Sequence, residues 1–261
     1  MFLTTAKSAS GQENEEALRL SAEWNIRFEP RKKRSFQKWL RETKESIYVV
    51  GNDLDKLYHP DYSQAFLFHP SMAWIRFQRL QQGGFDPMIE VMQLHSGMTC
   101  LDTTMGLASD SILASAAVGE KGKVTAVESH QYIAHLVRKG LNHWEEDDES
   151  FNKAMRRIDV RKGEHLDLLK KLNDNSYNIV YFDPMFDHAI QDSVHLAPLR
   201  QFAMYQPLEK EAIEEAIRVA ENRVVVKSTY LDSLLESFGF MYYYRKGASF
   251  SYAVFEKGER I

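Results

Sequence analysis

The stretch MTCLDTTMGLASDSILASAAVGEKGKVTAVES, residues 98–129, decides the fold class of this chain. MTCLDTT is an apolar run typical of a buried strand, SDSILASAAVG is typical of a helix, and GKVTAVES is again strand-like. Strands that alternate with helices of this length indicate a parallel sheet with helices on both faces. We therefore predict an α/β fold built on a mostly parallel sheet.

The same alternation continues toward the C-terminus. Helices are predicted over residues 130–144, 164–172 and 208–220, and strands over residues 155–163, 177–183 and 222–228. The acidic run at residues 145–149 is predicted to be a solvated loop, because like charges resist burial. Two aromatic-rich strands at residues 238–247 and 248–258 predict an antiparallel hairpin, which a purely parallel sheet would not need.

The region before Gly84 is less regular. Short strands are predicted over residues 1–5 and 46–53, and helices over residues 14–24 and 71–84. The segment RKKRSFQKWLRETK, residues 31–44, is basic and is predicted to be a helix, because Phe36, Trp39 and Leu40 lie at helical spacing. We predict two domains: a small α/β region over residues 1–84 and a larger domain over residues 85–261.

Composition limits the partners and the compartment. The 261 residues carry a net charge of -4, so any contact with nucleic acid needs a local basic patch. Cys100 is the only cysteine, which excludes an internal disulfide and a cysteine-based zinc site and favours a reducing compartment. The first residues lack a secretory signal, and no apolar run approaches the ~20 residues needed to span a bilayer. We expect a cytoplasmic protein without a membrane or metal partner; oligomeric state is left open.

The loop LDTTMGLASD joins the first strand of this domain to its helix, where doubly wound sheets bind ligands. Gly106 permits close approach of a ligand, but the dinucleotide fingerprint needs three glycines and this loop has one. Glu128 ends the second strand, where a carboxylate can accept both hydroxyls of a ribose, although a solvated strand-end acid is an equal alternative. Together with Asp102 and Asp110, these residues favour a nucleoside ligand.

The turn YFDPMF follows the strand at 177–183 and places Asp183 at the same edge of the sheet. Pro184 lacks an N–H and leaves its carbonyl free to accept, and Phe186 offers a flat apolar face. Two acceptors beside an aromatic ring suit a planar ligand with an amino group, such as a nucleobase. The alternative is a strand-ending turn with Phe186 packed inward.

Several of these motifs resemble those of a known enzyme family. Through LDTTMGLASDSILAS, VTAVESH, KGEHLDLL, YFDPMF and RVVVKS, the chain resembles class I S-adenosylmethionine-dependent methyltransferases over residues 100–228. Within them it is similar to the small-subunit ribosomal RNA guanine-N2 methyltransferases called RsmJ. The whole chain, including FHPSMA, resembles methyltransferase-like proteins of Gram-positive bacteria more closely. The resemblance implies a Rossmann-like, seven-stranded sheet with a C-terminal hairpin, in a catalytic domain over residues 85–261.

The resemblance also implies a site. It implies that the donor S-adenosylmethionine contacts residues at the ends of several strands. Together with the residues of the first loop, the candidate donor-binding residues are Asp102, Thr103, Thr104, Gly106, Ser109, Asp110, Glu128, Ser129, Glu164, His165 and Asp183. The candidate catalytic residues are those of the DPMF turn: Asp183, Pro184, Met185 and Phe186. Three positions depart from the family pattern, namely Ala108 in place of a second glycine, Glu164 and His165 in place of small hydroxyl residues, and Asp187 in place of a proline.

The sequence says less about which residues contact the substrate than about those that bind the donor. Phe186, Lys227 and His69 are candidates, and each has a plain structural alternative in packing or in a solvated strand end. The basic segment at residues 31–44 could lie along phosphates or form a solvated helix face, so substrate binding is the candidate role of residues 1–84. The leading hypothesis is a methyltransferase acting on an exocyclic amine of RNA, guanine N2 of ribosomal RNA, and hence a role in rRNA processing. Alternatives are a protein, DNA or small-molecule acceptor, a nicotinamide oxidoreductase, and a non-catalytic RNA-binding relative.

Overall fold

The computed structural model describes residues 1–7, 9–32, 34–61, 64–184, 208–228, 231–244, 247 and 250–258. This part of the chain forms two compact units. Unit 1 contains Met1–His69 and His135–Trp144, and unit 2 contains Pro70–Ala134 together with residues 145–184 and the described residues from 208 onward. Unit 2 thus begins at Pro70, ahead of the expected boundary at Gly84. None of the helices in the described ranges is both long and apolar enough to cross a membrane.

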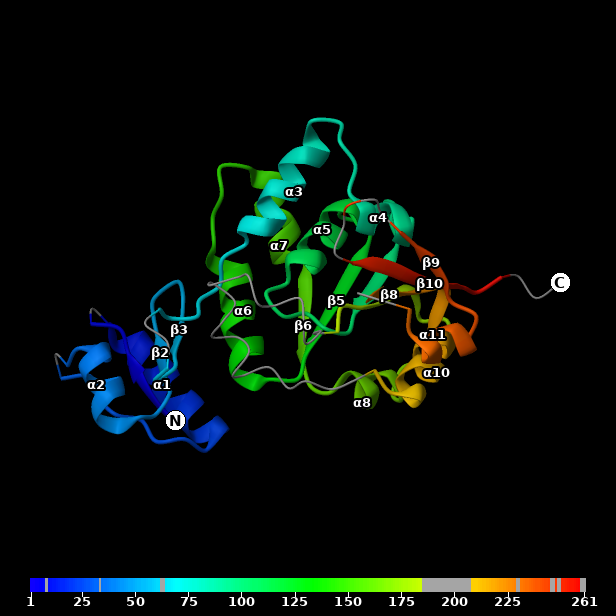
Figure 1. Ribbon diagram of the computed structural model, residues 1–261. Coiled ribbons are helices and arrows are strands. Elements are labelled where there is room, and N and C mark those ends of the chain that lie inside the picture. The colour runs from blue at the N-terminus through cyan, green and yellow to red at the C-terminus, as the bar shows by residue number, and fades with distance from the viewer. Residues whose placement is uncertain are drawn as a thin grey trace. The chain divides into compact units, whose positions relative to one another are not determined.

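Unit 2 is built on a seven-stranded sheet (Figure 1). Its strands, in spatial order, are β6 (Ile158–Lys162), β5 (Lys123–Glu128), β4 (Thr99–Asp102), β7 (Tyr177–Phe182), β8 (Ala220–Ser228), β10 (Ser251–Glu256) and β9 (Met241–Tyr243). The first five are parallel, whereas β10 pairs antiparallel with both β8 and β9. The Rossmann-like α/β fold with a C-terminal antiparallel hairpin is therefore confirmed.

Helices cover both faces of this sheet. They are α3 (Ser71–Gln81), α4 (Pro87–Met92), α5 (Ser109–Val118), α7 (Glu149–Arg156), α8 (His165–Leu169), α10 (Lys210–Val219) and α11 (Ser233–Ser237). Figure 1 shows α4, α5 and α7 on one side of the sheet and α8, α10 and α11 on the other. Because both faces are covered, the central strands are buried: β7 reads YNIVYF and all but its second residue are buried.

The strand order indicates where a ligand is expected to bind. From β4 the chain moves outward through β5 to β6, and then returns to the other side of β4 to form β7 and β8. The order therefore reverses between β4 and β7. In open α/β sheets the crevice for ligands lies at the carboxyl ends of the strands at such a reversal.

Unit 1 contains a three-stranded sheet of β1 (Phe2–Thr5), β2 (Ile47–Val50) and β3 (Lys56–Tyr58), with α1 (Gly11–Trp24), α2 (Phe36–Thr43) and most of α6 (Gln131–His143). The strands β1 and β2 are parallel, and β3 is antiparallel to β2. A small core joins the sheet to α2: Phe2, Trp39, Leu40, Ile47 and Val49. Burial of these side chains stabilises unit 1, because each fully buried large apolar side chain contributes about 1.5–3 kcal/mol.

Two details of the predicted elements are wrong. The basic segment at residues 31–44 is only partly helical, because α2 begins at Phe36. Lys32 has a φ of 45°, in the left-handed region, which a right-handed helix cannot include. The acidic run at residues 145–149 is not wholly a loop, since Asp148 caps α7 by accepting from the N–H of Phe151 and Glu149 is its first residue.

Candidate active site

Asp102 ends β4 and organises the loop that follows. Its side chain is 2% exposed and accepts from the N–H of Thr104 at 3.0 Å and from the hydroxyl of Ser111 at 2.5 Å. Burial raises the pKa of Asp102 to about 7, against the opposing effect of these two donors. Thr103 also fixes the loop, because its N–H and its hydroxyl both donate to the carbonyl of Tyr181 on β7.

Gly106 and Glu128 meet across this loop. The N–H of Gly106 donates to Oε2 of Glu128 at 3.2 Å, and the N–H of His130 donates to Oε1 at 2.9 Å. Burial raises the pKa of Glu128, and these two backbone donors oppose the shift. Gly106 has a φ of 50°, and a Cβ placed there would meet no atom within 4 Å, so the loop borders open space. Each carboxylate oxygen keeps a lone pair for a further donor.

Ala108 and α5 complete the first loop. Ala108 is the N-cap of α5 and has a φ of 61°, a conformation that costs a residue with a side chain roughly 1–2 kcal/mol. The departure from glycine noted in the sequence therefore falls at a left-handed position. Ser109 and Asp110 follow as the first two residues of α5, and Asp110 adds negative charge at the positive end of the helix.

Glu164 and His165 lie at the end of β6. Glu164 is the N-cap of α8 without a side-chain capping bond, and both side chains are half-buried, as is Ser129 after β5. The ring of His165 meets Phe182 edge to face, with centroids 5.7 Å apart, and burial lowers the pKa of His165. The N–H of Gly163 donates to the carbonyl of Glu128, which ties the ends of β5 and β6 together.

Asp110 is the centre of a charged network. Nη1 of Arg76 lies 2.5 Å from Oδ1 of Asp110, and the same guanidinium forms two bonds to Asp86, at 2.8 and 2.9 Å. The hydroxyl of Tyr181 donates to Oδ2 of Asp110 at 2.8 Å. Burial alone would raise the pKa of Asp110, but Lys227 and Arg76 outweigh it, so the pKa is lowered and the carboxylate stays ionised.

Asp183 and Lys227 extend this network at the ends of β7 and β8. Nζ of Lys227 lies 2.7 Å from Oδ2 of Asp183 and 3.8 Å from Oδ2 of Asp110. Burial raises the pKa of Asp183, Asp110 adds to the increase, and Lys227 opposes it. Side-chain exposures of 31% for Asp183 and 23% for Lys227 leave both groups accessible. The N–H of Asp183 donates to the hydroxyl of Thr104, so the turn is fixed to the first loop.

The structure brings most of the predicted site residues to one edge of the sheet. Pro184 is half-buried at the end of the described segment. Met185, Phe186 and Asp187 lie outside the described residues. His69 belongs to unit 1, where its ring packs edge to face on Trp144 with centroids 4.6 Å apart.

Sequence reasoning missed three members of the charged network: Arg76, Asp86 and Tyr181. The sequence contains a signal for Tyr181, because it stands two residues before Asp183 and alternate residues of a strand share a face. Arg76 had none, since its contact with Asp110 spans 34 positions and depends on how α3 packs against α5.

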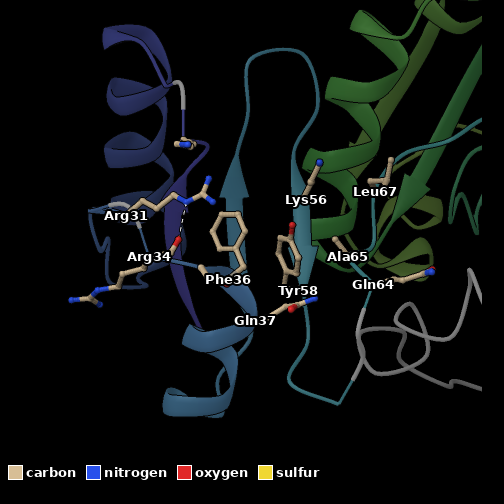
Figure 2. Close-up of a pocket in the computed structure, with 11 residues that line it drawn as sticks. Arg31, Arg34, Phe36, Gln37, Lys56, Tyr58, Gln64, Ala65 and Leu67 are labelled. Atoms are coloured by element: carbon tan, nitrogen blue, oxygen red, sulfur yellow. Dashed lines mark hydrogen bonds between the residues drawn. The ribbon is translucent and has the colours of Figure 1, made fainter.

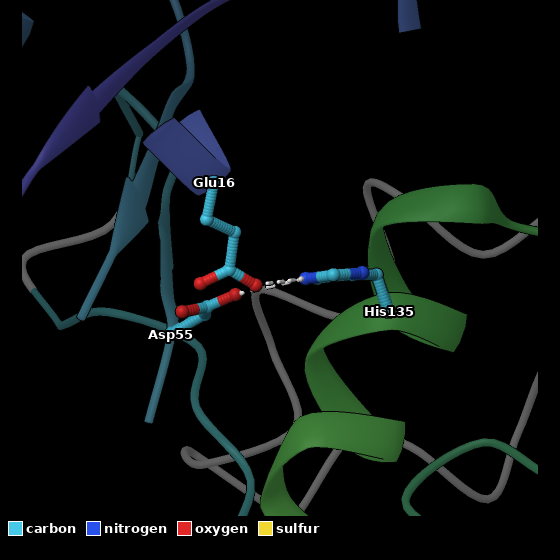
Figure 3. A group of neighbouring side chains, drawn as sticks. All are labelled: Glu16, Asp55 and His135. Atoms are coloured by element: carbon cyan, nitrogen blue, oxygen red, sulfur yellow. Dashed lines mark ion pairs between the residues drawn. The ribbon is translucent and has the colours of Figure 1, made fainter. Parts of the chain in front are cut away.

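A second cluster of titratable groups lies in unit 1 (Figure 3). Nε2 of His135 points at the carboxylates of Glu16 and Asp55 and lies 3.4 Å from each. This is ligand-like spacing, but Nζ of Lys139 lies 2.8 Å from Glu16 and 2.9 Å from Asp55. Because the ammonium pairs with both carboxylates, we describe the cluster as a partly buried ion-pair network.

The geometry fits an S-adenosyl donor. The carboxylate of Glu128 retains acceptor capacity for ribose hydroxyls, and the open space at Gly106 admits close approach of a ligand. Three carboxylates face two cations in the network of Asp86, Asp110, Asp183, Arg76 and Lys227. The surplus negative charge suits a sulfonium, which is positively charged.

Comparisons with known proteins agree with this fit. The family model described as "Putative SAM-dependent methyltransferase" (SAM_MT) matches residues 23–244. A Bacillus subtilis (strain 168) protein named "Uncharacterized protein YpiP" is 39% identical over 255 residues, which cover 98% of this chain and 99% of that protein.

More distant similarities point the same way. Ribosomal RNA small subunit methyltransferase J of Tolumonas auensis is 29% identical over 181 residues, covering 67% of this chain and 71% of that protein. The crystal structure of a SAM-dependent methyltransferase from Neisseria gonorrhoeae superposes with a TM-score of 0.62 over 98% of this chain and 96% of that chain. At 18% identity the latter shows the shared fold alone. The chain belongs to the SAM_MT family and is an S-adenosylmethionine-dependent methyltransferase.

Proposed function

We propose that this methyltransferase modifies an exocyclic amine of an RNA base, with guanine N2 of small-subunit ribosomal RNA as the acceptor. The observation that carries the proposal is the position of Asp183. Its carboxylate stands at the sheet edge beside the first loop, is partly exposed, and is held by Lys227 at 2.7 Å.

Asp183 has the properties needed to bind an exocyclic amine that accepts the methyl group. The lone pair of an exocyclic amine is delocalised into the base, and acceptors for both N–H groups help to localise it on nitrogen. Asp183 would accept one N–H, and the carbonyl of Pro184, which follows it directly, would accept the other. S-adenosylmethionine supplies an electrophilic methyl group on a sulfonium sulfur. Most of the catalysis is then positioning of the amine nitrogen, which these acceptors provide.

Asp183 also takes up the proton that the amine loses. Burial and Asp110 raise the pKa of Asp183, and a carboxylate with a raised pKa is a better proton acceptor near neutral pH. Lys227 is unsuited to this task, because Asp183 and Asp110 raise its pKa despite burial, so it remains an ammonium. We assign Lys227 to hold Asp183 in place and to contact the substrate.

The remaining roles in the proposal follow the predicted site. Donor binding is assigned to Asp102, Thr103, Thr104, Gly106, Ser109, Asp110, Glu128, Ser129, Glu164, His165 and Asp183. The catalytic turn is assigned to Asp183, Pro184, Met185 and Phe186, with Phe186 stacking on the base, and His69 remains a candidate substrate contact. Residues 1–84 are proposed as the substrate-binding domain and residues 85–261 as the catalytic domain.

Relatives support RNA as the partner. The proteins from Tolumonas auensis and Dechloromonas aromatica are both named Ribosomal RNA small subunit methyltransferase J. The Dechloromonas protein is 29% identical over 160 residues, which span 62% of its length. A ribosomal RNA substrate would place the reaction in rRNA processing in the cytoplasm.

Transfer of a labelled methyl group tests the proposal. RNA from a strain lacking the gene should accept tritium from labelled S-adenosylmethionine, whereas wild-type RNA should not, because its target is already methylated. Asp183→Asn should abolish transfer while donor binding remains measurable by calorimetry, because the other assigned donor contacts are kept. The exposed Asp147 provides a matched control, and Asp147→Asn should transfer normally. Labelling of protein or of small metabolites instead of RNA would overturn the RNA assignment.

A further inference from the structure

A groove in unit 1 combines positive charge with two adjacent aromatic rings. It has a volume of about 700 Å³ and is bordered by residues of the 31–37 segment, of β3 and of the segment after β3. Its charged and aromatic lining residues are Lys7, Arg31, Arg34, Lys56, Phe36 and Tyr58. Figure 2 shows the rings of Phe36 and Tyr58 side by side, with Arg31 and Arg34 on one side of them and Lys56 on the other.

The charge of this groove is of one sign. Four of its lining residues are cationic and none is acidic, in a protein whose net charge is -4. Arg34 has an acid nearby, Glu29, at 3.6 Å. Among the described residues no carboxylate forms an ion pair with Lys7, Arg31 or Lys56. A cluster of cations without paired carboxylates, on a protein with a negative net charge, is typical of a site that binds a polyanion.

The aromatic rings form a fixed platform. The centroids of Phe36 and Tyr58 are 4.8 Å apart, with the planes tilted by 33°. Both rings are half-buried and pack against the core of unit 1, so they are held in position. The guanidinium of Arg31 lies over Phe36, 4.0 Å from the ring centroid. A planar base could stack on such a surface in the same way.

We propose that this groove binds a single-stranded segment of the RNA substrate, with one base stacked on the Phe36–Tyr58 platform and flanking phosphates on Lys7, Arg31, Arg34 and Lys56. The proposal rests on the proposed function for the identity of the polyanion. Cations alone would suit any polyanion, but the half-buried rings add a flat apolar surface on which an unpaired base can stack. An acidic peptide offers the charge without the planar face.

Binding of a fluorescent single-stranded RNA of about ten nucleotides, followed by anisotropy, tests this site in the full-length protein. The double variant Arg31→Gln/Lys56→Gln should bind more weakly and lower the slope of log affinity against log salt by about 1–2. Tyr58→Leu keeps an apolar side chain but removes the ring and should weaken binding about tenfold, whereas Tyr58→Phe should restore it. Lys210→Gln is the matched control, because Lys210 is an exposed cation of α10 in unit 2 that pairs with Glu214 and does not line the groove.

The outcomes separate this site from the proposed function. Equal RNA binding by wild type, the double variant and Tyr58→Leu would overturn the groove, even if the protein methylates RNA. Competition by polyglutamate as strong as by RNA would overturn the base-stacking assignment. If wild type binds RNA through the groove but transfers no methyl group to it, the groove stands and the proposed function falls. Calorimetric binding of S-adenosylmethionine should be equal in all variants, which shows that each of them is folded.

Discussion

The ammonium of Lys227 lies 2.7 Å from the carboxylate of Asp183, although the two residues are 44 positions apart and follow different strands. The same ammonium is 3.8 Å from Asp110, the first-turn acid of α5. Lys227 therefore joins the proposed donor side of the site to the proposed acceptor side. The ring of Phe250 lies 4.9 Å from this ammonium and partly shields it.

Replacing Lys227 by Gln should shift the pH dependence of methyl transfer. Burial and Asp110 raise the pKa of Asp183, and Lys227 is the main opposing influence, so its loss raises that pKa further. Since Asp183 must be ionised to accept a proton, the acidic limb of the pH–rate profile should move to higher pH. Activity near neutral pH should fall about tenfold. This loss is smaller than the full contribution of general acid–base catalysis, because Asp183 itself is still present.

Lys227→Arg is the control for this shift. It keeps the positive charge, so its acidic limb should stay close to that of the wild type. A limb that stays in place in Lys227→Gln would show that Asp183 is not the group that titrates.

Asp102→Asn should change how stability depends on pH. Burial raises the pKa of Asp102 from 3.8 to about 7, so the folded state binds more protons than the unfolded state between these values. Stability contributed by this group is therefore present at low pH and lost as pH rises toward 7. The advantage of wild type over Asp102→Asn should shrink by about 2–3 kcal/mol between about pH 5 and pH 8.

Urea denaturation of both proteins at the two pH values measures this difference. Asn retains an acceptor and a donor for Thr104 and Ser111, so the loop keeps its hydrogen-bonding partners. Parallel stability curves for the two proteins would mean that Asp102 ionises normally.

The sheet of unit 2 could be predicted from the sequence, and the charged network could not. The central strands β4, β5 and β7 gave apolar runs because both faces of the sheet are covered there. Short elements such as α4 and β3 were missed, since six or three residues carry little periodicity. Asp183 could be found because it directly follows a buried strand. The role of Arg76 depends on the packing of α3 against α5, which no local sequence pattern predicts.

Gly140→Ala should destabilise the protein, although alanine is the better helix former. A Cβ at Gly140, within α6, would lie 2.2 Å from the ring of Phe68. The clash outweighs the helix preference of ~1 kcal/mol, and a net loss of about 1–3 kcal/mol is expected. Gly11, the first residue of α1, has no atom within 4 Å of such a Cβ, so Gly11→Ala should leave stability within about 0.5 kcal/mol. Equal melting temperatures for the two variants would contradict the contact.

His135→Gln should remove a pH-dependent contribution from unit 1. Burial lowers the pKa of His135, but the carboxylates of Asp55 and Glu16 outweigh it, so the pKa is raised. Trp24 and Tyr48 pack on the ring, and Lys139 competes for the same acids. The protonated ring stabilises the folded state below about pH 6.5, and this stabilisation is lost as pH rises through the folded-state pKa.

Denaturation of wild type and His135→Gln at about pH 5.5 and pH 9 tests this contribution. The advantage of wild type should be larger at the lower pH. Zinc at either pH should leave the stability of the wild type unchanged, because the ammonium of Lys139 already pairs with both carboxylates and would have to be displaced. An advantage that grows with pH, or a large stabilisation by zinc, would contradict the ion-pair description.

Mass spectrometry of nucleosides from small-subunit ribosomal RNA tests the central claim most directly. RNA from a strain that lacks the gene should lose one N2-methylguanosine. Expression of the wild-type protein should restore it, and expression of Asp183→Asn should not. Identical nucleosides in the deletion strain and its parent, or full restoration by Asp183→Asn, would contradict the account.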